Sequence, residues 1–283
     1  MAIISSVDCI EQGTDWKITI PTAALASNSL LIEPTSGQPN SSELFKMVQK
    51  VAQFWESKGV KNYLVYKSNE DTAWEMVPVQ GTKTSFWDRS RAFAHQLYVV
   101  SSVTFGRYSV SESEKDRLIT EYKDLASFDA KETASTVNQV AQDAFCKKAV
   151  IDSQLIWEGK YVRVLYNYAP IGSEGLHFLL VPKAHKEGLT ELSQEEFEEV
   201  QTLAETLKQH YPNHRCYRYN KTGSLAGQTV PHFHEHVVFV LPQDDFKGKL
   251  SVFLRMITPP QPLNSQQLSE RVSELKFKFN ELE

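Results

Sequence analysis

Three histidines, His232, His234 and His236, stand at every second position of the chain. Side chains alternate between the two faces of an extended strand, so this spacing predicts three imidazole rings on one face. Imidazole can accept a proton, donate one or attack as a nucleophile near neutral pH. Three interpretations follow. The histidines could be structural residues, they could bind a metal ion, or one of the rings could attack a phosphorus atom.

The phosphorus interpretation is favoured over the other two. A row of like rings gains little from packing and repels itself when protonated. Alternate histidines can bind zinc, but zinc usually takes a further His, Cys or carboxylate, and none stands in an obvious ligand motif. We therefore expect no metal and no other cofactor.

A small polar loop, NKTGSLAGQT from Asn220 to Thr229, comes just before the row. Its glycines let backbone N–H groups turn toward an anion, although an ordinary hairpin loop would have a similar composition. Gln228 and Thr229 follow Gly227 as side-chain donors. Next to the histidines, this composition favours a phosphate-binding loop.

The segment GQTVPHFHEHVV resembles the histidine triad family. That family is marked by His-φ-His-φ-His-φ-φ, with φ apolar, after a Gly-Gln-Ser/Thr loop. The segment departs from the pattern at Glu235, which replaces one φ residue on the face away from the rings. The departure predicts a partly solvated rear face.

The resemblance covers roughly residues 145–240, because Phe145-Cys-Lys-Lys148 also looks like the opening of these proteins. It implies that His185, in a Pro-x-x-His sequence, lies behind the triad. It also implies that Asn167 holds a nucleotide ribose. With Asn220, Gly227, Gln228 and Thr229, these two residues complete the expected substrate-binding set.

The resemblance also implies a mechanism. His234, the middle ring, is expected to attack phosphorus and form a transient nucleotidyl-imidazole. His232 is expected to fix the tautomer of His234, and His236 to bind phosphate oxygen and protonate the leaving group. Gln228, Thr229 and loop N–H groups would stabilise the nonbridging oxygens.

The expected activity is hydrolysis of a nucleoside phosphoramidate or a dinucleoside polyphosphate. Hexose-1-phosphate uridylyltransferases and dinucleoside polyphosphate phosphorylases resemble this chain in being tandem units with one working site. They typically carry Gln at the third triad position, whereas His236 matches the hydrolases. A nucleotidyltransferase or phosphorylase is the alternative, and a non-enzymatic nucleotide-binding adaptor is a third possibility.

An internal repeat organises the chain. Each half reads as two strands, a serine-opened helix, two more strands, another strand and a last helix. The expected strands are 16–21, 28–34, 62–67 and 74–79 in the first half and 162–166, 176–182, 215–220 and 234–239 in the second. The helices open at Ser42 and Ser193, and the last helices span 111–124 and 265–277. In register, Trp74 and Met76 replace His234 and His236, so the first half lacks the triad.

We therefore predict an α+β fold of two tandem units, each an antiparallel sheet with a main packed helix, which form a pseudo-dimer within the chain. Residues 1–128 would be a degenerate repeat, 129–144 a linker and 145–283 the catalytic domain. The first unit would be a scaffold, with His95 a structural or surface residue.

The composition is typical of a soluble globular protein, with 283 residues, 41% hydrophobic and 23% charged. A net charge of -5 argues against a general nucleic-acid binder. No signal sequence or membrane span is expected. Cys9, Cys146 and Cys216 suit free thiols, so we expect a cytoplasmic protein that binds a small nucleotide substrate, either as a monomeric pseudo-dimer or as a homodimer.

Overall fold

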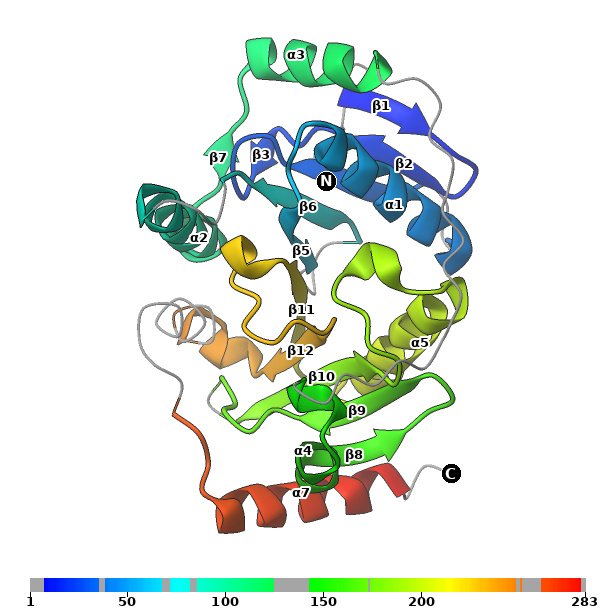
Figure 1. Ribbon diagram of the computed structural model, residues 1–283, viewed down its shortest axis with the longest axis vertical. Coiled ribbons are helices and arrows are strands. Elements are labelled where there is room, and N and C mark those ends of the chain that lie inside the picture. Colours follow the sequence, from blue (N-terminus) through cyan, green and yellow to red (C-terminus); the bar gives the residue numbers. More distant parts are fainter. Residues whose placement is uncertain are drawn as a thin grey trace. The chain divides into compact units, whose positions relative to one another are not determined.

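The computed structural model divides into two compact units, and it describes residues 8–35, 39–67, 72–81, 86–124, 143–172, 174–247, 250 and 261–280. The first unit comprises Met1–Glu132 and Lys221–Gln228. The second comprises Thr133–Asn220 and Thr229–Glu283. Figure 1 shows the elements of both units in sequence colours. The predicted linker, 129–144, lies outside the described residues except for Asp143 and Ala144.

The first unit contains an antiparallel sheet of five strands in the order β1-β2-β4-β6-β5. The strands are β1 (Cys9–Gln12), β2 (Trp16–Thr19), β4 (Leu30–Pro34), β5 (Asn62–Lys67) and β6 (Trp74–Val79). The helices are α1 (Ser41–Ser57), α2 (Phe86–Phe105) and α3 (Glu112–Lys123). A short ribbon pairs β3 (Ala23–Ala24) with β7 (Tyr108–Ser109).

The second unit contains five antiparallel strands in the order β8-β9-β10-β12-β11. They are β8 (Leu155–Glu158), β9 (Val162–Tyr166), β10 (Leu176–Pro182), β11 (Arg215–Thr222) and β12 (Glu235–Val240). The helices are α4 (Lys148–Gln154), α5 (Gln194–His210) and α7 (Ser265–Asn280). Short 3-10 turns precede α4 (Ala144–Cys146) and α5 (Leu189–Glu191) and follow β11 (Ser224–Ala226) and β12 (Pro242–Asp244).

The two units share one strand order. The sequence β1-β2-β4-β6-β5 in the first unit corresponds position by position to β8-β9-β10-β12-β11 in the second. In both units the main helix follows the third strand of this order, as α1 follows β4 and α5 follows β10. The α+β fold of two units, each an antiparallel sheet with a main helix, is confirmed.

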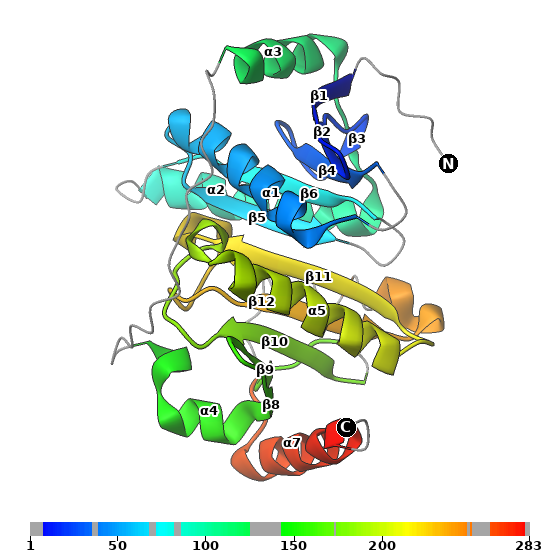
Figure 2. The same cartoon turned by 90° about the vertical axis from the view of Figure 1, so that its right-hand side faces the viewer.

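The main helices form because an apolar stripe at helical spacing finds a sheet to cover. In α1 the stripe is Phe45, Val48 and Ala52, and its side chains are buried. The equivalent stripe of α5 is also buried, and each helix packs on its own unit's sheet (Figure 2). Ser193 caps α5 through a capping box with Glu196. The expected opening at Ser42 is wrong, because Asn40 is the N-cap and accepts the N–H of Ser42.

Among the described residues, no helix combines the length and apolar character that crossing a bilayer requires.

Candidate functional site

The three triad histidines do not form one uninterrupted row. Strand β12 begins only at Glu235, and bends precede it. Pro231 has no N–H to donate to a sheet ladder, and the N–H of His232 instead bonds Val230 O at 2.8 Å in a turn. His234 and His236 form an edge-on pair with ring centroids 4.9 Å apart. The ring of His232 is fully buried in a separate polar cluster.

The ring of His234 is oriented by the backbone of the preceding histidine. Its Nδ1 lies 2.8 Å from the carbonyl oxygen of His232. A carbonyl only accepts hydrogen bonds, so Nδ1 carries the proton and donates it, and the lone pair stands on Nε2. Phe145 packs against the same ring with centroids 5.2 Å apart. The bond thus holds the neutral form of the His234 ring in the tautomer that leaves the lone pair on Nε2.

A second tautomer is set by His177, which the sequence analysis did not select. Ile171 N–H points at His177 Nδ1 at 3.3 Å, so Nδ1 accepts. His177 Nε2 then carries a proton and donates it to His236 Nδ1 at 2.9 Å. By the same reasoning His236 is neutral and bears its proton on Nε2. This chain of hydrogen bonds makes His236 a hydrogen-bond donor at Nε2.

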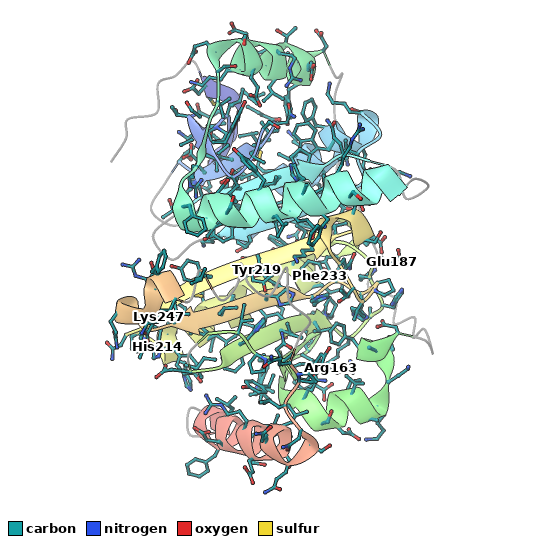
Figure 3. The ribbon with its side chains drawn as sticks, turned by 90° about the vertical axis from the view of Figure 1, so that its left-hand side faces the viewer. Arg163, Glu187, His214, Tyr219, Phe233 and Lys247 are labelled. Carbon is teal, nitrogen blue, oxygen red and sulfur yellow. The ribbon has the colours of Figure 1, made fainter. Side chains whose placement is uncertain are left out.

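Tyr219 completes the surroundings of His236. Tyr219, which is labelled in Figure 3, comes from β11 and pairs with His236 across the ladder. The two rings stack with centroids 4.4 Å apart and planes 11° apart. Burial raises the pKa of the Tyr219 hydroxyl, so it remains a neutral phenol. A flat, neutral ring therefore fixes the plane of His236.

The buried cluster around His232 centres on Asp143. His232 Nδ1 and His185 Nδ1 both bond Asp143 Oδ2, the latter at 2.8 Å, and His232 Nε2 lies 3.0 Å from Pro182 O. Burial alone would raise the pKa of Asp143, but the hydrogen bonds from the two histidines lower it below its usual value. Asp143 is therefore a buried carboxylate that orients both rings. The ring centroid of His185 lies 5.3 Å from that of His232.

This cluster could also hold a metal ion. Asp143, Cys146, His185 and His232 offer four ligand atoms within 4.8 Å of one another. A thiolate, two imidazoles and a carboxylate fit zinc, and the bond from His232 Nε2 to Pro182 O would leave Nδ1 as the ligand atom. The sequence analysis missed this set because Asp143 is 89 residues from His232. The Asp-x-x-Cys spacing at 143–146 was the available signal.

We expect Zn²⁺ to stabilise the native protein and the Cys146→Ala variant much less. Ligands that bind only the folded state raise stability by about 2.7 kcal/mol at 100 times their Kd. Thermal unfolding with and without added Zn²⁺, and after chelation, measures the effect. Cys9→Ala, a free cysteine outside the cluster, is the matched control. Equal unfolding midpoints with and without Zn²⁺ in the native protein would contradict the assignment.

The rear face of the triad strand is buried, so the expected partly solvated face is wrong. Glu235 is 1% exposed and its Oε1 accepts from Arg218 Nε at 2.6 Å. Arg218 also donates from Nη2 to Gln201 Oε1 of α5 at 2.7 Å. Glu235 therefore replaces an apolar residue because a guanidinium neutralises it inside the layer between sheet and helix.

The glycine-rich loop adopts a closed turn. Gly223 N donates to Gln228 Oε1 at 2.7 Å, and Gln228 N donates to Gly223 O at 3.3 Å. Gly227 lies in the left-handed region with φ 86°, which favours glycine. Thr229 is exposed. The side-chain carbonyl of Gln228 thus closes the loop, and its role toward a substrate stays a prediction.

Asn220 and Asn167, two of the predicted substrate-binding residues, have buried side chains that make contacts within the protein. Asn220 is fully buried and pairs with Glu235, so it lies on the face away from Tyr219 and His236. The side chain of Asn167 accepts from Ala169 N at 3.0 Å and places Nδ2 3.2 Å from His177. Neither side chain is open to a ribose. Asn167 instead supports His177, which holds His236.

The first unit carries no triad on its corresponding strand, where Trp74 and Met76 are buried in β6. His95 of α2 lines a cavity of about 350 Å³ together with Arg91 and Gln80. Burial lowers the pKa of His95. His95 is thus partly buried at a cavity wall.

Solved structures of other proteins share the two-unit fold of this chain. A uridylyltransferase structure matches 94% of this chain and 86% of its own, with TM-score 0.52 and 13% identity. A GalT-like protein from Arabidopsis thaliana matches 92% of this chain and 84% of its own, with TM-score 0.50 and 10% identity. No curated protein matches by sequence. These likenesses show that the two-unit fold is shared.

The family comparison falls on the unit that holds the three histidines. Residues 148–241 match the HIT domain family. The match begins at α4, includes the segment of β10 that holds His177, and ends after β12. Residues 148–241 are therefore similar to HIT domains, and this stretch includes all three histidines.

Proposed function

We propose that the chain is a nucleotide hydrolase that works through a nucleotidyl-His234 intermediate. The observation that carries the proposal is the hydrogen bond from His234 Nδ1 to the carbonyl of His232, because it assigns the lone pair to Nε2. A ring held in this tautomer needs no further base before it attacks. Phosphoryl transfer can then proceed in two steps on one side chain.

In the first step His234 Nε2 forms a bond to phosphorus, and the bond from phosphorus to the leaving group breaks. The imidazole becomes cationic, and the carbonyl of His232 stabilises that charge through Nδ1–H. In the second step water attacks phosphorus, the N–P bond breaks and its electron pair returns to Nε2. The water releases one proton to solvent, and a nucleoside monophosphate leaves. Gly227, Gln228 and Thr229 are proposed to bind the nonbridging oxygens.

The state of His236 favours one substrate class. His177 donates to His236 Nδ1, so His236 keeps a neutral ring with a proton on Nε2. A neutral imidazole N–H donates a hydrogen bond but is a weak acid near pH 7, so His236 would bind a phosphate oxygen rather than protonate an amine. We propose this hydrogen-bond-donor role for His236 in place of the general-acid role that the resemblance implies. A leaving group that departs as an anion fits best, which selects dinucleoside polyphosphates over phosphoramidates.

The experiment compares diadenosine polyphosphates with adenosine phosphoramidate. We expect mononucleotide release with kcat/KM at least about tenfold higher for the polyphosphates, and an acid-labile mass increase of one nucleotidyl group on the quenched protein. Faster turnover of phosphoramidate would contradict the substrate class. Tight binding without turnover of any compound would contradict hydrolysis and favour an adaptor.

A transferase is the second candidate, because the uridylyltransferase structure shares the two-unit fold over 94% of this chain. Transfer requires an acceptor in place of water in the second step. Supplying inorganic phosphate or a hexose 1-phosphate during turnover distinguishes the two. Formation of a new nucleoside diphosphate or nucleotide sugar would support transfer, and unchanged mononucleotide yield supports hydrolysis.

A further inference from the structure

The loop before the triad is packed as part of the first unit. Residues Lys221–Gln228 cluster with Met1–Glu132, although Asn220 and Thr229 on either side belong to the second unit. The loop contains the 3-10 turn Ser224–Ala226 and two glycines with positive φ. The unit that lacks the triad thus contains the loop that precedes it in sequence.

Both backbone groups of Leu225 are bonded by side chains of the first unit. Its N–H donates to Asn62 Oδ1 of β5 at 3.2 Å. Its carbonyl accepts from Gln96 Nε2 of α2. One residue at the centre of the loop is therefore fixed from two elements by one donor and one acceptor. These two hydrogen bonds fix where the backbone of Leu225 lies.

Apolar contacts also join the loop to the same strand-and-helix region of the first unit. Leu225 and Ala226 are 5% and 2% exposed and form a buried cluster with Val79 of β6 and Ala92 of α2. Ala92 lies four residues before Gln96, so one face of α2 supplies both the apolar and the polar contact. The loop is held by a small core and by two hydrogen bonds, rather than by its own turn alone.

The two glycines allow the close approach. A Cβ on Gly223 would lie 2.1 Å from Asn62 Oδ1, and one on Gly227 would lie 2.8 Å from Gln96 Oε1. Both residues also have φ values that disfavour side chains. Glycine at positions 223 and 227 therefore leaves room for the side chains of Asn62 and Gln96.

We propose that Asn62 and Gln96 are positioning residues, by which the triad-lacking unit holds Leu225 and so fixes the conformation of Gly227 and Gln228, the loop residues proposed to bind phosphate. This inference rests on the proposed function, because it assigns the loop to that same site. It gives the first unit a defined role in the reaction. A displacement of about 1 Å at a positioned group can lower the rate about 100-fold.

The test uses near-isosteric substitutions with opposite expected results. Asn62→Asp keeps an acceptor for Leu225 N–H and should behave like the native protein. Gln96→Glu replaces the donor by a carboxylate facing the Leu225 carbonyl, and should lower kcat about 10- to 100-fold. Asn62→Leu, which removes the acceptor, should follow Gln96→Glu. Gln12→Glu, an exposed residue of β1, is the matched control for charge.

Limited trypsin cleavage after Lys221 reports on the loop independently of activity. Lys221 is partly buried in the native protein, so cleavage there should be slow and should accelerate about tenfold in Gln96→Glu and Asn62→Leu but not in Asn62→Asp. Thermal unfolding verifies that each variant is folded, and Gln96→Ala replaces any variant that is not. Native-like cleavage and turnover in both Gln96→Glu and Asn62→Leu would overturn the inference. A native protein that turns over no nucleotide would overturn the proposed function, while the cleavage result would still decide whether the first unit holds the loop.

Discussion

Replacing His234 by Ala is expected to lower kcat/KM about 100- to 10,000-fold, roughly 2.7 to 5.4 kcal/mol in the barrier, and to abolish the covalent adduct. The physical reason is the single lone pair at Nε2, which the bond to the His232 carbonyl assigns to that atom. Steady-state turnover and the intact mass of the quenched protein measure the two effects.

A matched control separates this effect from loss of a histidine in general. His210 lies at the end of α5, outside the cluster around the triad, and His210→Ala should keep kcat/KM within about twofold of the native value. His234→Ala should also unfold at nearly the native temperature, because the change leaves the buried His232 and Asp143 bonded. Full turnover by His234→Ala, or an adduct that persists in it, would show that the nucleophile is another group.

Local patterns in the sequence predicted the eight central strands, the two main helices and the spacing of the three histidines, but not β1, β8, α2 or α4. The alternating segment 162–166 and the apolar segment 176–182 became β9 and β10, and the Phe197, Val200 and Ala204 stripe became the buried face of α5. These signals can be read from the sequence because the side-chain periods of a strand (2 residues) and a helix (3.6 residues) depend only on the segment itself. The prediction of two equivalent units followed from the same rhythm repeated along the chain.

The groups that orient the rings could not be predicted in the same way. His177 meets His236 over 59 residues of chain, and Asp143 meets His232 over 89. Such contacts depend on strand order, which single segments do not encode. Pro231 was the one local signal that the row of histidines would be interrupted, since proline cannot join the ladder. The buried state of Glu235 was missed for a similar reason, because its partner Arg218 is on the neighbouring strand.

Replacing Arg218 by Met is expected to destabilise the protein by about 3 to 5 kcal/mol. Arg218 and Glu235 have side-chain exposures of 4% and 1%, and their salt bridge at 2.6 Å is buried. Removing one partner leaves an unpaired charge in a medium that solvates it poorly. Urea unfolding of the native and variant proteins measures the loss, and a change below about 1 kcal/mol would contradict a buried ion pair.

The double variant Arg218→Met/Glu235→Leu tests whether the loss comes from the unpaired charge. With both charges gone, an apolar pair of similar volume should recover most of the stability, because the desolvation cost of a buried pair about equals its attraction. Leu at 235 also restores the apolar residue of the histidine triad pattern. If the double variant is as unstable as Arg218→Met, the loss arises from packing against Gln201 and α5 instead of from charge. If stability returns but turnover does not, the ion pair serves to hold His234 and His236 in register, since Glu235 is the residue between them.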